Sequence, residues 1–176
     1  MRGIFCSYVV AGCMAMQVSA GDWMQWRGSN RDLIVAGEKL LDRWPEGGPQ
    51  QVWRIELPGE GYSEPAVVGG MIYITGNTGD KKNREGFLYA LEAKTGKIAW
   101  QTKYGPEWVA SYEFARTSPT VVDGCAYVVG GLGHVACIDT KDGKVVWTVD
   151  AHGAFGGRNI TWGIADNPLI YDGKVI

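Results

Sequence analysis

Two cysteines are the residues with the clearest capacity for chemistry in this chain of 176 residues. Cys125 and Cys137 lie on two strand-like segments that are joined by the glycine-rich turn Gly130-Gly131-Leu132-Gly133. Across such a hairpin, in an oxidising compartment, the two thiols could pair as a disulfide. The other interpretation is two small buried residues, because a matching segment earlier in the chain has Ala90 where Cys137 stands.

No metal or catalytic site is expected from the remaining polar residues. His134 and His152 are the only histidines, and further ligands at metal-binding spacing are absent from the sequence. Asp139, Asp142 and Gly143 resemble a calcium loop superficially, but they lack the ligand order of an EF-hand and fit a turn between two strands better. We therefore assign no catalytic residue and no metal ligand.

The composition favours an all-β protein with no nucleic-acid partner. The 17 basic and 19 acidic residues form no long run of either sign, so neither nucleic acid nor an anionic membrane surface is indicated. The 26 glycines and 8 tryptophans suit many short strands that are joined by tight turns and packed with large aromatic side chains.

The first twenty residues have the pattern of a signal peptide. Arg2 precedes an apolar stretch from about Ile4 to Met16, and Val18-Ser19-Ala20 is a small-residue cleavage site. The stretch is shorter than a membrane-spanning helix requires, so the mature chain is predicted to be exported without a transmembrane segment. Because Val10-Ala11-Gly12-Cys13 resembles a bacterial lipobox, a lipid anchor at Cys13 is the alternative to free release.

A repeat organises the rest of the chain. Trp53, Trp100 and Trp147 are spaced by 47 residues and 47 again. The phrase from Ala90 to Trp100 realigns with the phrase from Cys137 to Trp147 and preserves an acidic residue, glycine, lysine and tryptophan. Such a period indicates repeated structural units.

Each repeat is predicted to contain four antiparallel strands. The segments from Pro65 and Pro119 both read as strand, two-residue turn and strand, with Gly69-Gly70 and Asp123-Gly124 as pairs that tolerate positive φ. The predicted strands are Glu64 to Val68, Met71 to Thr75, Phe87 to Glu92 and Lys97 to Lys103, then Ser118 to Val122, Cys125 to Val129, His134 to Asp139 and Lys144 to Val149. Four-stranded units at this period predict the blades of a β-propeller.

The predicted propeller is incomplete. The two blades cover 62–103 and 117–149, and a third copy opens at 167–176, where the chain stops inside its expected second strand, so we expect a fragment of a longer protein. Residues 51–57 are predicted to be an outer strand without a blade of its own, and 21–50 an N-terminal extension with a short helix from Leu33 to Arg43.

Two loops stand out between the predicted strands. The connection from Tyr104 to Thr117 is rich in aromatic residues, so it either forms a binding surface or uses Trp108 and Phe114 to cover the edge of a blade. The segment from Gly76 to Gly86 has no counterpart in the second repeat and is predicted to be a solvated hairpin tip.

The phrase A-x-D-x-x-x-G-K-x-x-W resembles the tryptophan-docking motif of quinoprotein-type propellers, a family that includes PQQ-dependent alcohol dehydrogenases and the propeller lipoprotein of outer-membrane barrel assembly. Glu92 and Cys137 depart from the aspartate and alanine that are usual there. Residues 22–32 likewise resemble the opening of exported PQQ-like repeat proteins of planctomycete-type bacteria. The resemblance implies that Trp53, Trp100 and Trp147 hold adjacent blades together and that Gly96 and Gly143 form the turns, which are structural functions.

The resemblance also sets the functional alternatives. An active quinoprotein needs PQQ on the propeller axis, a calcium ion and a proton-accepting aspartate, and these groups come from several blades. Related alcohol dehydrogenases carry a disulfide of adjacent cysteines, and this chain has no Cys-Cys pair. We therefore predict a non-catalytic binding or scaffold module with protein partners in the periplasm or outer cell envelope of a bacterium. The alternative is the N-terminal part of a PQQ-dependent dehydrogenase, with PQQ and calcium bound only by a full-length parent.

Overall fold

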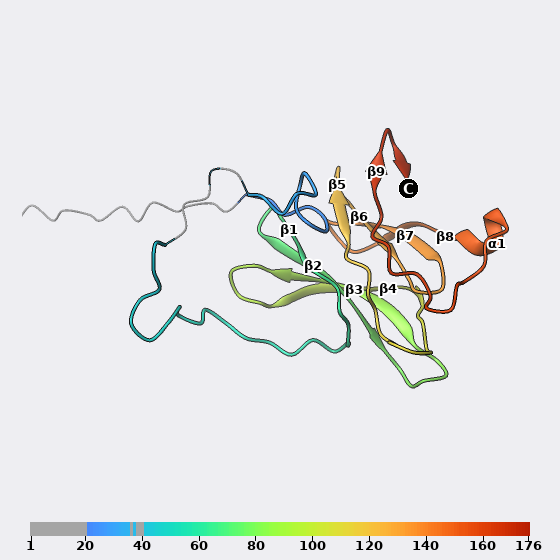
Figure 1. Ribbon diagram of the computed structural model, residues 1–176, viewed down its shortest axis with the longest axis horizontal. Helices are drawn as coiled ribbons and strands as arrows, with labels where there is room; N and C mark the ends of the chain where they lie inside the picture. The colour runs from blue at the N-terminus through green and yellow to red at the C-terminus, as the bar shows by residue number, and fades with distance from the viewer. Residues whose placement is uncertain (1–20, 36, 38–40) are drawn as a thin grey trace, which may run out of the picture.

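The computed structural model describes residues 21–35, 37 and 41–176, and its first four strands form one antiparallel sheet (Figure 1). The order across this sheet is β1-β2-β3-β4, so each strand pairs with its neighbour in sequence. The strands are β1 Ala66–Val68, β2 Met71–Thr78, β3 Glu85–Glu92 and β4 Ile98–Pro106.

A second sheet repeats the first, in the order β5-β6-β7-β8. A five-residue helix and a two-stranded hairpin follow it (Figure 1). The elements are β5 Thr120–Val122, β6 Cys125–Val129, β7 His134–Asp139, β8 Val145–Asp150, α1 Ala151–Phe155, β9 Ile170–Tyr171 and β10 Lys174–Val175. Two four-stranded blades and the first hairpin of a third confirm an incomplete, nearly all-β propeller.

The two-residue turns adopt the backbone that the sequence predicts. Gly69 and Gly70 have φ of 59° and 77°, and Asp123 and Gly124 have φ of 51° and 75°. Positive φ at both central positions matches the twist of the flanking strands and so closes a tight hairpin. The β9–β10 turn repeats the pattern with Asp172.

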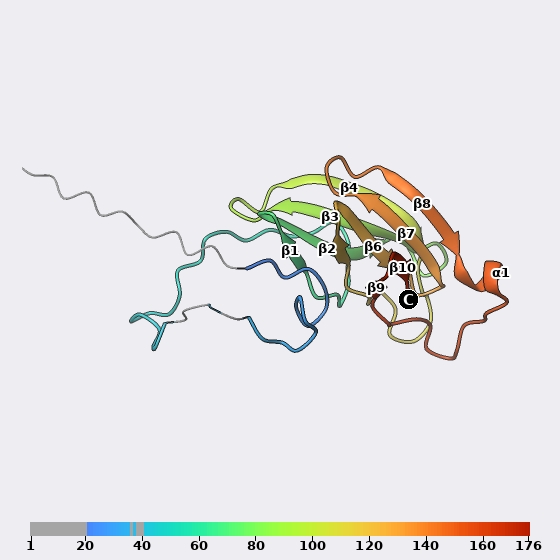
Figure 2. The ribbon, with the colours of Figure 1, turned by 90° about the horizontal axis from the view of Figure 1, so that it is seen from above.

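The hydrophobic core lies between the two sheets, which stack face to face. It combines buried residues of both: Ala66, Tyr73, Leu88, Ala90, Tyr104, Val121, Ala126, Val128, Ala136 and Ile138. Figure 2 shows β4 and β8 following one another along one rim, with β1 on the side nearer the N-terminal segment. A single sheet has an apolar face that it can bury only against another element. The blades therefore stack on one another.

Within the two blades the strand predictions were accurate in number and order, and the predicted hairpin tip was too long. Residues 79–83 are an exposed tip as predicted, but the rest of 76–86 is not, because β2 continues to Thr78 and β3 already begins at Glu85. Asn77 and Arg84 are buried there, at 1% and 8% exposure. Asn77 is held by pairing with Glu60 on one side and by its side-chain oxygen, which accepts from Ala115 N, on the other. These partners are distant in sequence, so a local reading could not include them.

Two predictions for the N-terminal extension also differ from the structure. Residues 51–57 run extended but are not assigned as a strand, because no described segment supplies the backbone partner that a ladder requires. The described part of 33–43 contains no helix, since Leu33 has φ of 63° and its N–H donates to Arg27 O. The predicted signal peptide, residues 1–20 with Cys13, lies outside the described residues, as do 36 and 38–40.

Candidate functional site

Trp53 contacts the turn between β3 and β4, although it precedes the first blade in sequence. Its Nε1–H donates to the carbonyl oxygen of Ala93 over 2.9 Å. Gly96 has φ of 71°, and a Cβ there would lie 2.6 Å from the Trp53 ring. The position needs glycine on both counts, because the backbone is left-handed and the indole occupies the space of a side chain.

Trp100 makes the same contact one blade later. Its Nε1 lies 3.3 Å from the carbonyl oxygen of Thr140, in the β7–β8 turn. Gly143 has φ of 73°, and a Cβ there would lie 2.8 Å from the Trp100 ring. Thr102, also on β4, donates its hydroxyl to Gly143 O over 2.5 Å. Each turn therefore receives a tryptophan from the preceding unit.

Trp147 is the third member of the series and has the most open surroundings. It is 38% exposed and contacts the Tyr127 ring, with centroids 6.1 Å apart. It lines an apolar hollow of about 630 Å³ between the second blade and the β9–β10 hairpin, together with Val129, Val149 and Val175. Trp147 therefore has an apolar hollow beside its ring, where Trp53 and Trp100 each have the turn of the next blade.

A hydrogen-bonded series that sequence reasoning missed links the residues before three prolines. The N–H of Glu64 donates to Ser118 Oγ over 2.8 Å, and the N–H of Ser118 donates to Asn167 Oδ1 over 2.5 Å. Each of these residues precedes the proline that opens a blade. The recurrence of a polar residue before that proline was the available signal. This series of hydrogen bonds ties successive blades together near their first strands.

Cys125 and Cys137 are free thiols on the same face of the second sheet. The register pairs Cys125 with Asp139 and Tyr127 with Cys137, so the two cysteines are diagonal neighbours rather than direct partners. Burial, then a hydrogen bond with Cys125, raises the pKa of the Cys137 thiol to about 11. At neutral pH this thiol is protonated and a poor nucleophile. Their pairing as a disulfide stays a prediction.

The histidines and the aspartates of the β7–β8 turn occupy separate places. His152 lies in α1, where its Nε2 is 3.1 Å from Asn159 Oδ1, and His134 pairs with Asp150 across the edge of the second sheet. Asp139 and Asp142 accept backbone N–H groups of their own turn through their side chains. Within the described ranges no three His, Cys, Asp or Glu residues gather as a metal site would require.

A buried carboxylate fixes the connection between the blades. Glu107 is 1% exposed, and its Oε1 accepts the hydroxyl of Tyr104 while its Oε2 accepts Gly131 N over 2.8 Å. Burial, followed by the charge of Glu107, raises the pKa of Tyr104 well above 10.0. Trp108, next to Glu107, packs against Gly131 and Gly163. This part of the 104–117 connection thus covers the edge of the second blade.

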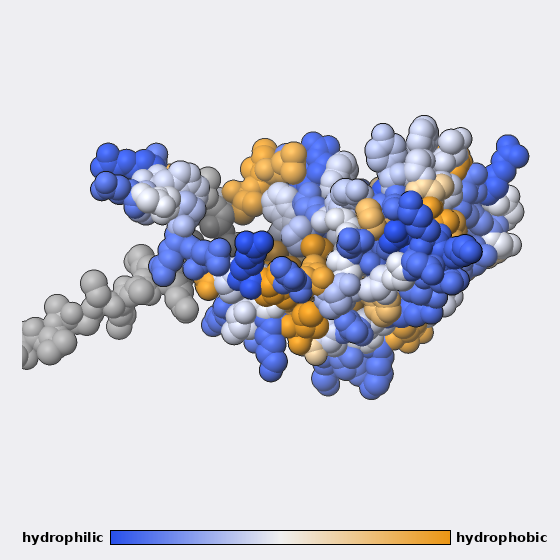
Figure 3. Space-filling model, turned by 90° about the horizontal axis from the view of Figure 1, so that it is seen from below, coloured by the Kyte–Doolittle hydropathy of each residue, from blue (hydrophilic) through white to orange (hydrophobic). Residues whose placement is uncertain are grey.

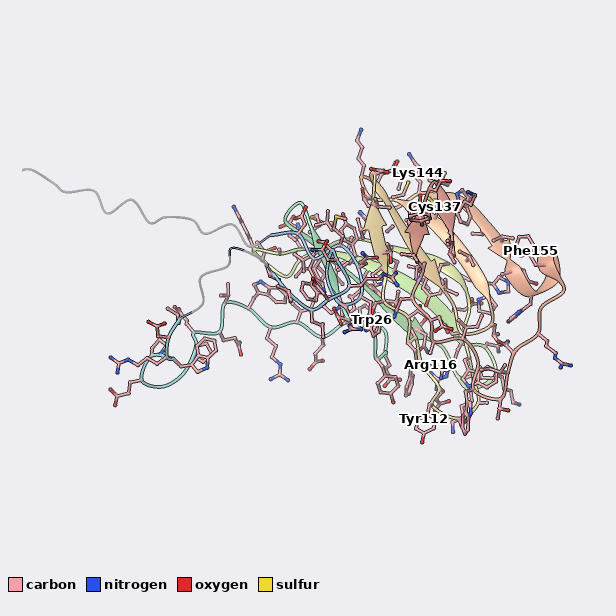
Figure 4. All side chains as sticks on the ribbon, turned by 45° about the horizontal axis from the view of Figure 1, so that its top comes forward. Trp26, Tyr112, Arg116, Cys137, Lys144 and Phe155 are labelled. Carbon is pink, nitrogen blue, oxygen red and sulfur yellow. The ribbon has the colours of Figure 1, made fainter. Side chains whose placement is uncertain are left out.

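The rest of that connection carries aromatic residues, of which Tyr112 is exposed and Phe114 is half-buried. We call the set Tyr62, Tyr112, Phe114, Arg116 and Trp162 the aromatic loop surface. Three separate connections supply it, and Tyr62, Tyr112 and Trp162 are 65%, 73% and 53% exposed. Figure 4 shows Tyr112 at the lower end of the molecule, Arg116 above it, and Lys144 at the upper end.

The aromatic loop surface is held in shape by contacts among its members. The rings of Tyr112 and Trp162 lie 6.1 Å apart, and Arg116 Nη2 donates to Trp162 O over 2.6 Å. The Tyr62 and Phe114 rings lie 5.9 Å apart. Beneath Phe114, Arg84 stacks at 4.6 Å and forms an ion pair of 3.0 Å with Glu113. Tyr112 and Phe114 have positive φ, 52° and 96°, a conformation that persists only where the surroundings impose it.

Among the described residues, no group of three His, Cys, Asp or Glu gathers to hold the calcium ion of a PQQ site. The carboxylate that opens the first blade, Glu64, uses its Oε1 to accept Trp23 Nε1–H, and Arg27 N lies 3.4 Å from the same oxygen. Backbone groups of 23–24 already pair with the first strands of both blades. The sequence also lacks a Cys-Cys pair. No step of a quinone-dependent oxidation is therefore assigned to these residues.

Solved propellers overlay on part of the chain. The crystal structure of BamB from Moraxella catarrhalis matches with a TM-score of 0.48 and 20% identity, over 69% of this chain and 31% of that chain. Quinohemoprotein alcohol dehydrogenase ADHIIG from Pseudomonas putida HK5 matches with a TM-score of 0.46 and 26% identity, over 70% and 17%.

Curated relatives come from two functional groups. The chain is 27% identical over 166 residues to the dehydrogenase subunit of alcohol dehydrogenase (quinone) from Gluconacetobacter polyoxogenes, which covers 89% of this chain and 21% of the relative. It is 30% identical over 150 residues to outer membrane protein assembly factor BamB from Burkholderia pseudomallei, covering 84% and 33%. The chain thus spans a third or less of the length of either.

A family model gives the assignment. It is described as outer membrane protein assembly factor BamB, and it matches residues 33–107 and 84–176. These overlapping matches extend over most of the chain and include Trp53, Trp100 and Trp147. The chain therefore belongs to this family of PQQ-like propeller repeats.

Proposed function

We propose that the chain is a non-catalytic binding module of the bacterial cell envelope and holds a protein partner through its aromatic loop surface. The observation that carries this proposal is the exposure of Tyr62, Tyr112 and Trp162 at one end of the blades. Large aromatic residues with an adjacent arginine are the side chains that dominate binding energy in protein interfaces. Because they are held by ring contacts and by Arg116, little order has to be gained on binding.

Site-specific photocrosslinking in the cell envelope tests this proposal. A photoreactive amino acid at Tyr112 should give a discrete adduct with another protein, identified by mass spectrometry. Lys144 is the matched control, since it is also exposed but lies at the opposite end (Figure 4). Trp162→Ala should lower the yield at Tyr112 about tenfold, as expected for the loss of an anchor residue. Equal adducts at Tyr112 and Lys144, or none at Tyr112, would contradict the proposal.

Export is the second part of the proposal. The family match to an outer membrane assembly factor and the pattern of residues 1–20 both support a periplasmic or outer-envelope location. None of the described helices is long and apolar enough to cross a membrane. Mass spectrometry of the mature chain should find Gly21 at its N-terminus. A lipidated Cys13 at that position would instead support the anchored alternative, and an uncleaved chain in the cytoplasm would contradict export.

The alternative function is the N-terminal part of a PQQ-dependent dehydrogenase. It is favoured by the identity of 27% to the alcohol dehydrogenase (quinone) subunit over 89% of this chain. Adding PQQ and calcium to the full-length protein and measuring dye-linked alcohol oxidation separates the two functions. Robust turnover would overturn the non-catalytic proposal, whereas no turnover beside an intact Tyr112 adduct would support it.

A further inference from the structure

The N-terminal segment lies along the first strands of both blades. Trp23 and Val67 form an antiparallel bridge through two backbone hydrogen bonds of 2.7 and 2.8 Å. The next residue, Met24, accepts Val121 N over 2.8 Å. Because β1 and β5 are the edge strands of their sheets, the segment pairs with edges that have no other strand beside them among the described residues. In a propeller these first strands line the central channel.

A third contact reaches the beginning of the next blade. Arg31 Nη2 donates to Pro168 O over 3.0 Å, while Arg31 Nε donates to the side chain of Gln25 over 3.0 Å. Pro168 immediately precedes the β9–β10 hairpin, whose ends are closed by backbone hydrogen bonds between Leu169 and Ile176. One short segment thus contacts three successive blades.

Glu64 anchors this segment. In the series of residues before prolines, Ser118 and Asn167 each use a side-chain oxygen to accept the N–H of the preceding member. Glu64 is the first member, and its side chain accepts Trp23 Nε1–H. The indole is covered by Gly28, where a Cβ would lie 2.8 Å from the ring.

The backbone of the segment is tightly wound. Arg27, Arg31 and Leu33 have φ of 64°, 59° and 63°, values that residues with a side chain adopt at a cost. Such a conformation persists when neighbouring contacts outweigh the cost. The contacts that stabilise this backbone are those with Glu64, Val67, Val121 and Pro168.

We infer that residues 22–31 form an axial strap, which covers the inner strand edges of the first blades and ties three blades together from the channel side. Exposed strand edges are templates for pairing with another chain. With the strap in place, a polypeptide cannot add a strand at β1 or β5. The channel side of these blades is thereby closed to strand addition, independently of which protein occupies the aromatic loop surface.

Hydrogen exchange on the purified chain tests the strap, because the amides of Val67 and Val121 donate to it. Trp23→Ala removes the contacts with Glu64 and Gly28 and should speed exchange at Val67 and Val121 about tenfold. Leu88 in β3 and Ile138 in β7 should change less than about twofold, since global unfolding is not needed to open an edge contact. Trp26→Ala is the matched control, because Trp26 belongs to the same segment but is 40% exposed, with the Arg27 guanidinium 5.3 Å from the centre of its ring.

Unchanged exchange at Val67 and Val121 in Trp23→Ala, or the same acceleration in Trp26→Ala, would overturn the strap. If Trp23→Ala also exposes Leu88 and Ile138, Arg31→Ala decides. That variant should speed exchange at Leu169 and Ile176 about threefold and leave Leu88 unchanged, because it removes the contact with Pro168 and one bond to Gln25 within the segment, but no contact with the first blade. No acceleration at Leu169 would then refute the third contact.

Discussion

The Nε1–H of Trp53 donates to the carbonyl oxygen of Ala93, and that of Trp100 faces the carbonyl oxygen of Thr140, one repeat later. Ala93 and Thr140 are the same position of the repeated phrase. The interval between the tryptophans is therefore also the interval between their acceptors. Each unit places its indole on the turn that follows, so the sequence period and the contact period coincide.

Replacing Gly143 by alanine should destabilise the chain markedly. The added methyl group would meet the Trp100 ring at 2.8 Å, and alanine would also have to adopt φ of 73°. Left-handed strain of about 1–2 kcal/mol and overpacking of about 1–3 kcal/mol together predict a loss of about 2–5 kcal/mol. Urea unfolding followed by circular dichroism measures it.

Gly124→Ala is the matched control for this substitution. Gly124 belongs to the same blade and has φ of 75°, but nothing lies within 4 Å of its Cβ position. Only the strain of about 1–2 kcal/mol applies. Combining Gly143→Ala with Trp100→Ala should remove the clash, so the two changes should cost less together than their sum. Equal losses for the two glycines would show that the indole contact does not matter.

Tyr104 should make the stability depend on pH in the alkaline range. Its folded pKa is raised well above 10.0 by burial and by the Glu107 carboxylate, so the unfolded chain releases this proton first. The stabilisation is fully present below about pH 10 and is lost as the pH rises toward the folded pKa. Tyr104→Phe should therefore flatten the alkaline fall in the urea midpoint. An unchanged slope would contradict the burial of an ionisable phenol at this position.

Glu107 provides a separate test of the same cluster. Glu107→Gln keeps an oxygen that can accept Gly131 N but removes the charge, so the pKa of Tyr104 should rise less and the alkaline fall should weaken. Glu107→Ala leaves the buried Gly131 N–H without that acceptor, which should cost about 1–3 kcal/mol. If alanine were tolerated as well as glutamine, the carboxylate would not be what fixes this connection.

Cys137→Ala tests how the thiol pair affects stability. Alanine is the natural choice, because Ala90 stands at the same position in the first blade. The folded pKa of Cys137 is raised from 9.0 to about 11, so its contribution to stability is present below pH 9.0 and is lost as the pH rises through about 11. The alanine variant should lack this loss.

Intact mass spectrometry of the exported chain decides the predicted disulfide: two missing hydrogens would show a Cys125–Cys137 bond, whereas two free thiols would refute it.

The sequence predicted the fold well because propeller blades are built from local signals. The turns at Gly69-Gly70 and Asp123-Gly124, and the strands β6 and β7, agree with the structure residue by residue. Helix α1 was missed, although Asp150 caps it and Gly156 ends it in a left-handed conformation, because five residues are too few to produce a helical period. Residues 51–57 were predicted to be an outer strand without a blade of its own, and because no described segment pairs with them they are not assigned as a strand.

The sequence by itself determined the repeat, the strand order within each blade and the glycine positions of the turns, since all of these depend on neighbours within one unit or on a constant spacing. The tertiary structure alone decided that Trp23 bonds Glu64, that Glu107 is buried under Gly131, and that Tyr112 and Trp162 meet at one end. These pairs join segments 24 to 50 residues apart in the chain without a repeated spacing. Only the packing of one blade against the next brings these pairs together. Packing depends on the positions of entire sheets, whereas a turn depends on a few neighbouring residues.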